Sequence, residues 1–571
     1  MKLFINILLV LSIALRLAAQ DVYTSQNYPR DYFTKPLDLP PSLAGSFGEI
    51  RSGHFHSGLD YRTNQREGYP VYAREDGYIS RLRVQIGGGG NIVYINHPNG
   101  YTTVYMHLQR FNARISQAVK AYQYRQQRFD VDFPLMPIEV PVKKGEIIAW
   151  SGRTGAVAGP HLHFEIRDTK TEETFNPQLF GLEVPDNVKP VINGLYMYRL
   201  NGLPFSQNTP KQYFQVVGVN GNYSINQSPV IQAGNEVGFG IMTYDQNVPG
   251  GNKNGVYSIE LQLDGQPIYL SALEGFFFQN SRAVNSHIDY PALLTTGRTI
   301  QKSFVEPGNP LTIYKVVQNR GIIRLSDDSV HNLQYIVKDV RGNTSTLSFK
   351  LKYNPKAILE AKEMPSVKTF LYNQDNEFNN ENVRVFIPKG NLYSDINFQY
   401  AESAKPAHGY SKTEHIHTRL IPVHQGYELW IKPDSTLRTE LQAKAIIMDT
   451  RGISQGGKFE NGYVKTTTRN FGSFYVGVDT VAPVIRPLNI SDGKSLAGVE
   501  SIYFRISDNL TGIGTFNGYI DGNWVLMEFN SSIATLWHTF EGNLKPGKHT
   551  FQLVVTDLKQ NSTSYTAIFY K

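Results

Sequence analysis

Residues 161–166 read HLHFEI, and this strict alternation of polar and apolar side chains is the feature that most constrains the fold. Successive side chains of a β-strand point to opposite faces. His161, His163 and Glu165 would therefore share one face of a strand, while the apolar residues cover the other. The pattern predicts a strand that presses its apolar face into a core and presents two imidazoles on the opposite side.

Two further stretches add an aspartate and two more histidines. Residues 56–60 read HSGLD, and residues 103–108 read TVYMHL. We expect the second stretch to be a strand with His107 on its polar face. Its apolar residues would then lie behind it, namely Val104, Met106 and Leu108. The four histidines and Asp60 suit a zinc site with three protein ligands, an open position for water and two imidazoles left for proton transfer.

The length and composition narrow the class of protein. A chain of 571 residues is too long for one hydrophobic core, so about three to five domains are expected. Lys and Arg number 56 and Asp and Glu 49, a net charge of +7 without a basic stripe. Nucleic acid is therefore not an expected partner, whereas an anionic polymer such as a cell wall is compatible. The absence of cysteine excludes disulfides and thiolate metal clusters.

The N-terminus has the features of an export signal. Lys2 precedes a nearly all-apolar run from Leu3 to Leu15, and Ala18-Ala19 supplies small residues for cleavage. We therefore expect a signal peptide over residues 1–19, with an uncleaved anchor as the alternative. Because no later segment is apolar throughout the length of a membrane span, we expect no stable span after cleavage. The protein would then lie in the periplasm, in the cell envelope or outside the cell.

Short β segments and frequent turn signals predict a mainly β protein. Residues 20–44 suggest an extended arm rich in proline and tyrosine, and residues 45–185 a compact antiparallel β domain. A helical insertion is expected at about 109–141, because apolar residues between 115 and 122 recur at helical spacing. This helix would either form one wall of a substrate groove or merely cover a sheet.

The remainder of the chain contains a weak internal repeat. The segments that lead into Asp339, Asp449 and Asp557 each suggest a strand followed by an Asp-initiated turn. Together with two Val/Pro-rich linkers, this repeat predicts three immunoglobulin-like β-sandwiches. Their expected ranges are 186–354, 355–480 and 481–571.

Other histidines form weaker patterns. His415-Ile416-His417, with Glu414 before it, lacks the glycine-rich turns of the first cluster, so we expect a solvated strand face there and not a metal site. His54 forms a further H-x-H pattern with His56. We expect it at the surface or behind the ligands.

The order of the motifs resembles the lysostaphin/LytM-type zinc endopeptidases, peptidoglycan peptidases with the duplicated hybrid motif fold. The resemblance covers about residues 45–180, with the helical insertion as the main departure. It is carried by HSGLD at 56–60, by YMHL at 105–108 and by GPHLHFE at 159–165, together with the turns between them. It implies a compact antiparallel β catalytic domain of lysostaphin type, followed here by the expected sandwiches.

The resemblance also implies roles for five residues. In that family the residues matching His56, Asp60 and His163 bind one zinc ion, and those matching His107 and His161 perform the acid–base and oxyanion work. One imidazole would take a proton from the attacking water and the other would stabilise the oxyanion, and the sequence leaves open which does which.

The resemblance thus implies a zinc metalloendopeptidase that hydrolyses peptide cross-links of peptidoglycan. Two alternatives remain. One is a non-catalytic regulator of wall hydrolases, and the other is an exported protease that acts on proteins. In each case the sandwich tail would bind the wall or a protein partner.

Overall fold

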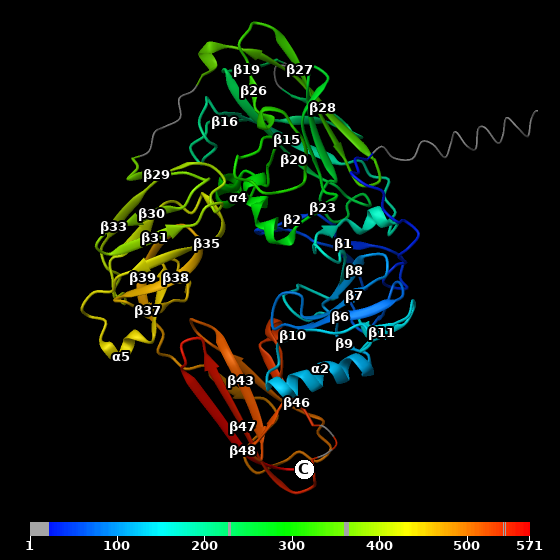
Figure 1. Cartoon of the computed structure of the whole chain (residues 1–571), viewed down its shortest axis with the longest axis vertical. Coiled ribbons are helices and arrows are strands. Elements are labelled where there is room, and N and C mark those ends of the chain that lie inside the picture. Colours follow the sequence, from blue (N-terminus) through cyan, green and yellow to red (C-terminus); the bar gives the residue numbers. More distant parts are fainter. Residues whose placement is uncertain (1–21, 227–229, 359–364, 541, 543) are drawn as a thin grey trace, which may run out of the picture.

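The computed structural model describes residues 22–226, 230–358, 365–540, 542 and 544–571. The protein is mainly β, as the sequence predicts, and its strands form four groups that follow one another around a circuit (Figure 1). The expected signal peptide at 1–19 lies outside the described residues. Within the described part of the chain, no helix is both long and apolar enough to cross a membrane.

The first group, here called the N-terminal region (residues 22–182), is built on one large sheet. β13 (His161–Asp168) lies at its centre, paired antiparallel with β4 (Leu59–Arg62) and β8 (Tyr101–Met106). The apolar residues of β13 are fully buried in the core, as the alternation predicts. In order across the sheet, the strands are β1 (Leu43–Gly45), β4, β13, β8, β7 (Asn91–Asn96), β6 (Gly77–Val84) and β10 (Val131–Pro134), with β11 (Pro141–Val142) beside β6 and β14 (Thr174–Phe175) beside β13.

The helix α2 (Ala113–Gln126) lies inside the insertion expected at about 109–141. The side chain of Asn112 caps its first turn by accepting a hydrogen bond from the Ile115 amide at 2.9 Å. Ile115 and Val119 turn inward to the core, so the helix covers the sheet beneath it. The nearby small elements are a sheet of β5 (Pro70–Tyr72), β12 (Ile147–Trp150) and β9 (Arg110–Phe111) and a hairpin of β2 (Ile50–Arg51) and β3 (His54–Phe55).

The expected N-terminal arm is described from residue 22 onward. It is mostly irregular, but it is anchored: Phe33 and Leu37 are buried in the core of the N-terminal region. The Tyr28 hydroxyl donates to the Glu274 carboxylate at 2.7 Å, which ties the arm to the next group. The arm ends in β1, which pairs with β4.

The second group, the first sandwich (residues 191–353), has two sheets around one core. One sheet contains β16 (Lys211–Phe214), β15 (Val191–Arg199), β20 (Glu236–Tyr244), β24 (Gln301–Lys302) and β26 (Ile323–Arg324). The other contains β17 (Val216–Val219), β18 (Asn222–Ile225), β19 (Val230–Ala233), β28 (Thr344–Tyr353), β27 (Val330–Lys338), β21 (Ser258–Leu263), β22 (Gln266–Ala272) and β25 (Tyr314–Val317).

One segment of the first sandwich leaves it and joins the N-terminal region. β23 (Gly275–Phe276) pairs with β14, and it is followed by α3 (Val284–His287) and α4 (Tyr290–Thr296). Phe276 and Val284 are fully buried in the core of the N-terminal region. This shared core is not apparent from the sequence.

The second sandwich (residues 368–478) and the third sandwich (residues 484–570) each have a core of their own. The second contains β29 (Lys368–Phe370), β30 (Asn376–Asn379), β31 (Val383–Ile387), β32 (Ile396–Phe398), β33 (Tyr400–Ser403), β34 (Thr413–Ile416), β35 (Pro422–Ile431), α5 (Thr439–Gln442), β36 (Ala445–Asp449), β37 (Lys458–Glu460), β38 (Tyr463–Asn470) and β39 (Gly472–Val478). The third contains β40 (Val484–Pro487), β41 (Lys494–Ser495), β42 (Ser501–Ser507), β43 (Ile513–Ile520), β44 (Asn523–Val525), β45 (Glu528–Asn530), β46 (Thr535–Thr539), β47 (Lys548–Asp557) and β48 (Ser562–Tyr570).

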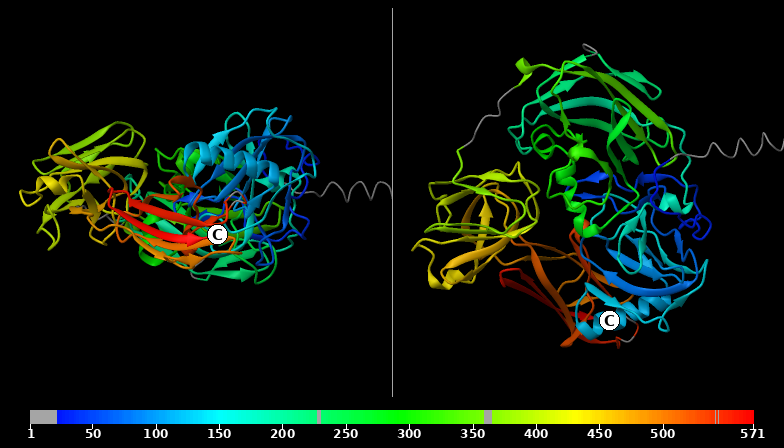
Figure 2. Two further views of the ribbon diagram at one scale, coloured as in Figure 1. Left: turned by 90° about the horizontal axis from the view of Figure 1, so that it is seen from below. Right: turned by 45° about the horizontal axis from the view of Figure 1, so that its top comes forward.

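The circuit closes where the third sandwich reaches the N-terminal region beside α2 (Figures 1 and 2). The Ser531 hydroxyl donates to the Ile86 carbonyl at 2.8 Å, and the ring of Trp524 packs edge-on against Tyr124 of α2. The first and the last of the four groups are therefore in contact.

Candidate metal centre

Three of the predicted site residues meet where β4 and β13 lie side by side. His163 of β13 is directly opposite Asp60 of β4, so their side chains leave the same face of the sheet. His56 lies in the tight loop that enters β4. That loop requires Gly58, because a Cβ atom there would lie 2.3 Å from the Phe164 carbonyl oxygen.

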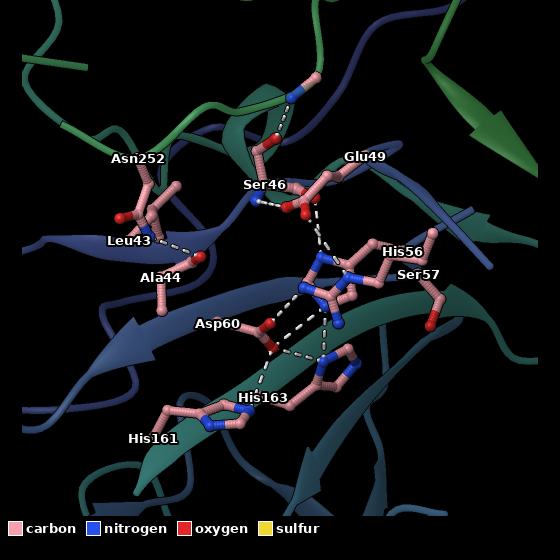
Figure 3. A network of polar contacts seen from close by, with 12 residues as sticks. Leu43, Ala44, Ser46, Glu49, His56, Ser57, Asp60, His161, His163 and Asn252 are labelled. Atoms are coloured by element: carbon pink, nitrogen blue, oxygen red, sulfur yellow. Dashed lines mark hydrogen bonds and ion pairs between the residues drawn. The ribbon is translucent and has the colours of Figure 1, made fainter. Parts of the chain in front are cut away.

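The donor atoms of these three residues form a small triangle (Figure 3). His56 Nε2 lies 2.9 Å from His163 Nδ1 and 3.0 Å from Asp60 Oδ1, and the third edge, His163 Nδ1 to Asp60 Oδ1, is 2.8 Å. A tetrahedral zinc ion with bonds of about 2.0–2.1 Å needs edges of roughly 3.3 Å, so the triangle is close to this size but slightly smaller. Two imidazoles and one carboxylate are also a common donor set for zinc, so the residues fit this ion.

Each imidazole of the triangle is oriented by a hydrogen bond on its far nitrogen. His56 Nδ1 lies 2.7 Å from the Ser46 carbonyl oxygen, and His163 Nε2 lies 2.9 Å from Glu165 Oε1. When these far nitrogens donate, the nitrogens that face Asp60 carry a lone pair. The sequence leaves the role of Glu165 open, and the structure places it behind His163.

His107 reaches the centre in a way that differs from the prediction. β8 ends at Met106, and His107 follows it with a left-handed backbone (φ 62°). The predicted apolar partition was wrong, because Met106 lies opposite His163 and shares its face of the sheet. The left-handed turn breaks the alternation and brings the ring of His107 to the same face.

The rings of His107 and His161 lie beside the triangle, with their centroids 4.8 Å apart. His107 Nδ1 is 2.9 Å from the Thr154 carbonyl oxygen, and His161 Nδ1 is 2.9 Å from that of Gly159. With both Nδ1 atoms donating, each ring keeps Nε2 as a proton acceptor. His161 Nε2 lies 3.5 Å from Asp60 Oδ1, so the five predicted residues form one cluster.

The electrostatics of the cluster favour a positive charge at the triangle and neutral imidazoles beside it. Burial opposes a charge on His163, yet its contacts with Asp60 and Glu165 raise its pKa to about 9. Burial and the neighbouring histidines lower the pKa of His107 to about 3. Burial likewise lowers the pKa of His161. Asp60 and Glu165 thus favour positive charge at the triangle, and burial favours the neutral form of His107 and His161 beside it.

Three supporting contacts were not predicted. Arg51 donates to Asp60 Oδ2 at 2.6 Å, on the carboxylate oxygen that does not face the histidines. Ser57 donates to Glu165 Oε1 at 2.5 Å, and Arg167 pairs with the other oxygen of Glu165. The alternation in β13 predicts that Glu165 lies on the face of His163, but no spacing in the sequence predicts the contact of Arg51 with Asp60.

The other histidines take different positions. His54 is exposed, which is one of its two expected positions. The face predicted to be solvated at 414–417 is half-buried at His415 and His417, while Glu414 on the other face of the strand is buried beneath the Tyr400 hydroxyl. His415 bonds to two serine hydroxyls. Of the residues that the structure describes, the only His-containing group with metal-ligand spacing is His56, Asp60 and His163.

A cavity of about 410 Å³ opens beside the segment 153–155, next to His107. Its wall includes Thr154, whose carbonyl oxygen accepts from His107, and residues of α2 such as Gln123. The third sandwich closes the opposite side with Phe529 and Trp537. The cavity therefore lies between the insertion helix and a domain that is distant in the sequence.

Comparison with known families gives two matches. Residues 54–124 match peptidase family M23, and this segment holds His56, Asp60 and His107. Residues 367–479 match the Zu5-like domain, and they span the second sandwich.

Related proteins are similar to part of this chain. An uncharacterized metalloprotease of Haemophilus influenzae is 40% identical over 118 residues, which cover 21% of this chain and 19% of that protein. The peptidoglycan DD-endopeptidase ShyC of Vibrio cholerae is 33% identical over 154 residues, covering 25% and 29%. The chain therefore spans less than a third of the length of these relatives. The catalytic domain of lysostaphin from Staphylococcus simulans is 26% identical, with 24% of this chain and 91% of that chain covered at a TM-score of 0.18.

Proposed function

We propose that this chain, which contains a peptidase family M23 domain, is a zinc metalloendopeptidase that hydrolyses peptide cross-links of peptidoglycan. The observation that carries the proposal is the pairing of a His–Asp–His triangle with two neutral imidazoles whose Nε2 atoms remain available. The substrate class is supported by the resemblance to lysostaphin/LytM-type enzymes and by the name of the Vibrio relative.

His56, Asp60 and His163 would hold the zinc ion. When bound, zinc polarises a peptide carbonyl and lowers the pKa of its water. His107 and His161 would supply the remaining chemistry. The Nε2 atom of one accepts the proton of the attacking water and later gives it to the leaving amine. The other would stabilise the oxygen that becomes negative, and for this its Nε2 has to carry a proton as well. The imidazole that takes up the proton needs to begin neutral, and the lowered pKa of each ring favours that state.

The cavity beside Thr154 would hold part of the substrate. This extends the expectation that the insertion helix forms one wall of a groove, with the third sandwich as the other wall. The same proposal includes the domain division expected from the sequence: a signal peptide, an arm, a catalytic domain at 45–185 and immunoglobulin-like sandwiches at 186–354, 355–480 and 481–571. Export is supported by the apolar N-terminus alone.

The proposal is tested with a digest of purified peptidoglycan of several cross-link types. The mature protein is incubated with each wall, with and without a chelator, and the fragments are identified by mass. We expect chelator-sensitive loss of cross-linked dimers, and the fragment masses name the bond. If zinc is bound but no wall releases fragments, the peptidase proposal fails and a regulator of other hydrolases is favoured. Cleavage of proteins but not of wall would favour the exported protease.

His163→Ala and His54→Ala form a matched pair of variants for this digest. His163 is a proposed ligand, while His54 is an exposed histidine close to the same site. We expect the first to abolish both zinc binding and cleavage, and the second to change neither. Circular dichroism confirms that each variant is folded.

A further inference from the structure

Three aspartates converge at the base of the first sandwich. Asp186 precedes β15, Asp245 follows β20 and Asp339 follows β27, and each offers an oxygen atom within 4.8 Å of the others. Their side chains are buried, with exposed fractions of 8%, 4% and 2% respectively. Buried carboxylates this close repel one another strongly, and a bound cation would offset that repulsion.

Two oxygen atoms at this place have no hydrogen-bond donor. Oδ1 of Asp245 and Oδ1 of Asn254 are both buried without a partner, and Asn254 is 5% exposed. The two residues form an antiparallel bridge, with backbone N–O distances of 3.0 and 2.8 Å, so their side chains leave the same side. Buried acceptors without a donor are costly, and a hard cation satisfies such oxygens.

Asn254 is also linked to the cluster through Asn247. The Asn254 side-chain amide donates to Asn247 Oδ1 at 2.6 Å, and Asn247 donates to Asp186 Oδ2 at 2.9 Å. Asn254 is therefore linked to Asp186 through Asn247 and to Asp245 through the backbone bridge. The resulting donor set consists of oxygen atoms only, which suits calcium and not zinc.

The third sandwich repeats this arrangement with a second cluster, Asp479, Asp508 and Asp557. Asn343 donates to Asp339 and to the Asp186 carbonyl, and Asn561 makes the same two contacts with Asp557 and Asp479. In that repeat, however, the Thr511 hydroxyl donates to Asp479 at 2.6 Å. Thr511 thus satisfies one carboxylate of this second cluster, while Oδ1 of Asp508 is buried without a partner, like Oδ1 of Asp245 in the first cluster.

The cluster is connected to the metal centre by the loop 245–255. Asn252 of this loop donates to the Ala44 carbonyl at 2.9 Å (Figure 3). The Gly255 amide donates to the Ser46 hydroxyl at 3.0 Å. The carbonyl of Ser46 is the group that orients His56. Any ligand that fixes this loop would therefore brace the acceptor that orients His56.

We infer that Asp186, Asp245 and Asp339 bind one calcium ion, with the Asn254 amide oxygen as a further ligand, and that the ion fixes the loop 245–255 against β1. The ion is structural and belongs to the junction between the first sandwich and the N-terminal region. The inference does not depend on the peptidase proposal, because calcium binding is measured without any substrate.

The test uses the full-length, zinc-loaded protein in calcium-free buffer. Calcium chloride is titrated in a calorimeter, and the melting temperature is followed in parallel. We expect one equivalent of calcium to bind and the melting temperature to rise with calcium concentration. No heat and no rise up to about 10 mM, above the roughly 1 mM of the weakest protein sites, would overturn the inference.

Asp245→Asn is the decisive variant and Asp328→Asn its control. Asn has the shape of Asp and removes one repelling charge, so we expect the calcium-free variant to melt no lower than the wild type. Its calcium affinity should fall at least about tenfold, while the exposed Asp328 can be changed without effect. Equal affinity in wild type and Asp245→Asn would refute the site. Asp186→Asn serves as a second variant should the first fail to fold.

Hydrogen exchange tests the bracing of the loop. Calcium should slow exchange of the Asn254 and Gly255 amides in the wild type but not in Asp245→Asn. Calcium binding without any slowing would overturn the structural role of the ion.

Discussion

Arg51 and Asp60 form a close ion pair, in which the guanidinium lies 2.6 Å from Oδ2 of the carboxylate. The other oxygen of Asp60 faces His56 and His163. Arg51 therefore fixes the rotation of the carboxylate, so that a single oxygen faces the two histidines. This is the same kind of support that Ser46 and Glu165 give to the two histidines.

Arg51→Gln should weaken zinc binding without abolishing it. Outer partners of metal ligands are typically worth about 10- to 100-fold in affinity, and we expect a loss in this range. Competition with a colorimetric chelator measures it. Arg66→Gln, at an exposed arginine nearby, is the control. An unchanged zinc affinity in Arg51→Gln would show that the carboxylate is oriented without the arginine.

Glu165→Gln tests the support behind His163. Glutamine keeps the shape of the buried side chain but removes the charge that His163 and Arg167 contact. We expect zinc affinity to fall by about 10- to 100-fold. The same chelator competition reports it, and near-ultraviolet circular dichroism shows whether packing is retained. A folded variant with wild-type affinity would contradict this role of Glu165.

His107→Ala should separate catalysis from metal binding. Its Nδ1 pairs with the Thr154 carbonyl oxygen and not with a residue of the triangle. We expect full zinc content and a fall in the cleavage rate of about 10²- to 10⁴-fold. Metal analysis and the wall digest are performed on the same sample. Loss of zinc together with activity would assign His107 a ligand role instead.

His287 should make stability depend on pH. It is buried beside Phe55, with Gln301, Lys302 and Tyr314 facing it. Burial lowers its pKa from 6.5 to about 4. Below pH 6.5 the unfolded chain binds a proton that the folded protein does not bind. The free energy of unfolding therefore decreases as the pH falls from 6.5 towards 4.

The loss from this residue amounts to at most about 3 kcal/mol. Urea unfolding of the wild type and of His287→Gln at pH 7 and pH 4.5 measures it. The difference in free energy of unfolding between the two pH values should be smaller in the variant. Identical differences would mean that His287 titrates normally in the folded protein.

Trp537→Ala tests whether the third sandwich contributes to the groove. Trp537 lines the cavity opposite α2, while Tyr570 of the same sandwich is exposed elsewhere. We expect KM for cross-linked wall fragments to rise several-fold in Trp537→Ala, with kcat and zinc content unchanged. Tyr570→Ala should behave as the wild type. A change in kcat alone would place the effect outside substrate binding.

The part of the site carried by β13 could be predicted because a strand has a period of two residues. His161, His163 and Glu165 share a face as the alternation requires, and Asp60 joins them because β4 is the neighbouring strand. The position of His107 was predicted for the wrong reason. Its left-handed backbone breaks the strand period, and no residue in the YMHL stretch predicts this turn.

The contacts between distant segments were beyond prediction from one sequence. Arg51 meets Asp60 through the β2–β3 hairpin, whose strands are two residues long. The cavity at Trp537 depends on a sandwich that returns to α2 after more than 400 residues. Such contacts follow from the packing of whole domains, which local periodicity does not encode.

The pairing of β14 with β23 has a consequence for how this protein can be divided. A fragment that ended at residue 185 would leave β14 as an open edge, with the apolar surface under Phe276 and Val284 exposed to water. Open edges and apolar patches promote self-association. The N-terminal region is therefore not a self-contained unit, and a soluble fragment of it has to include the first sandwich.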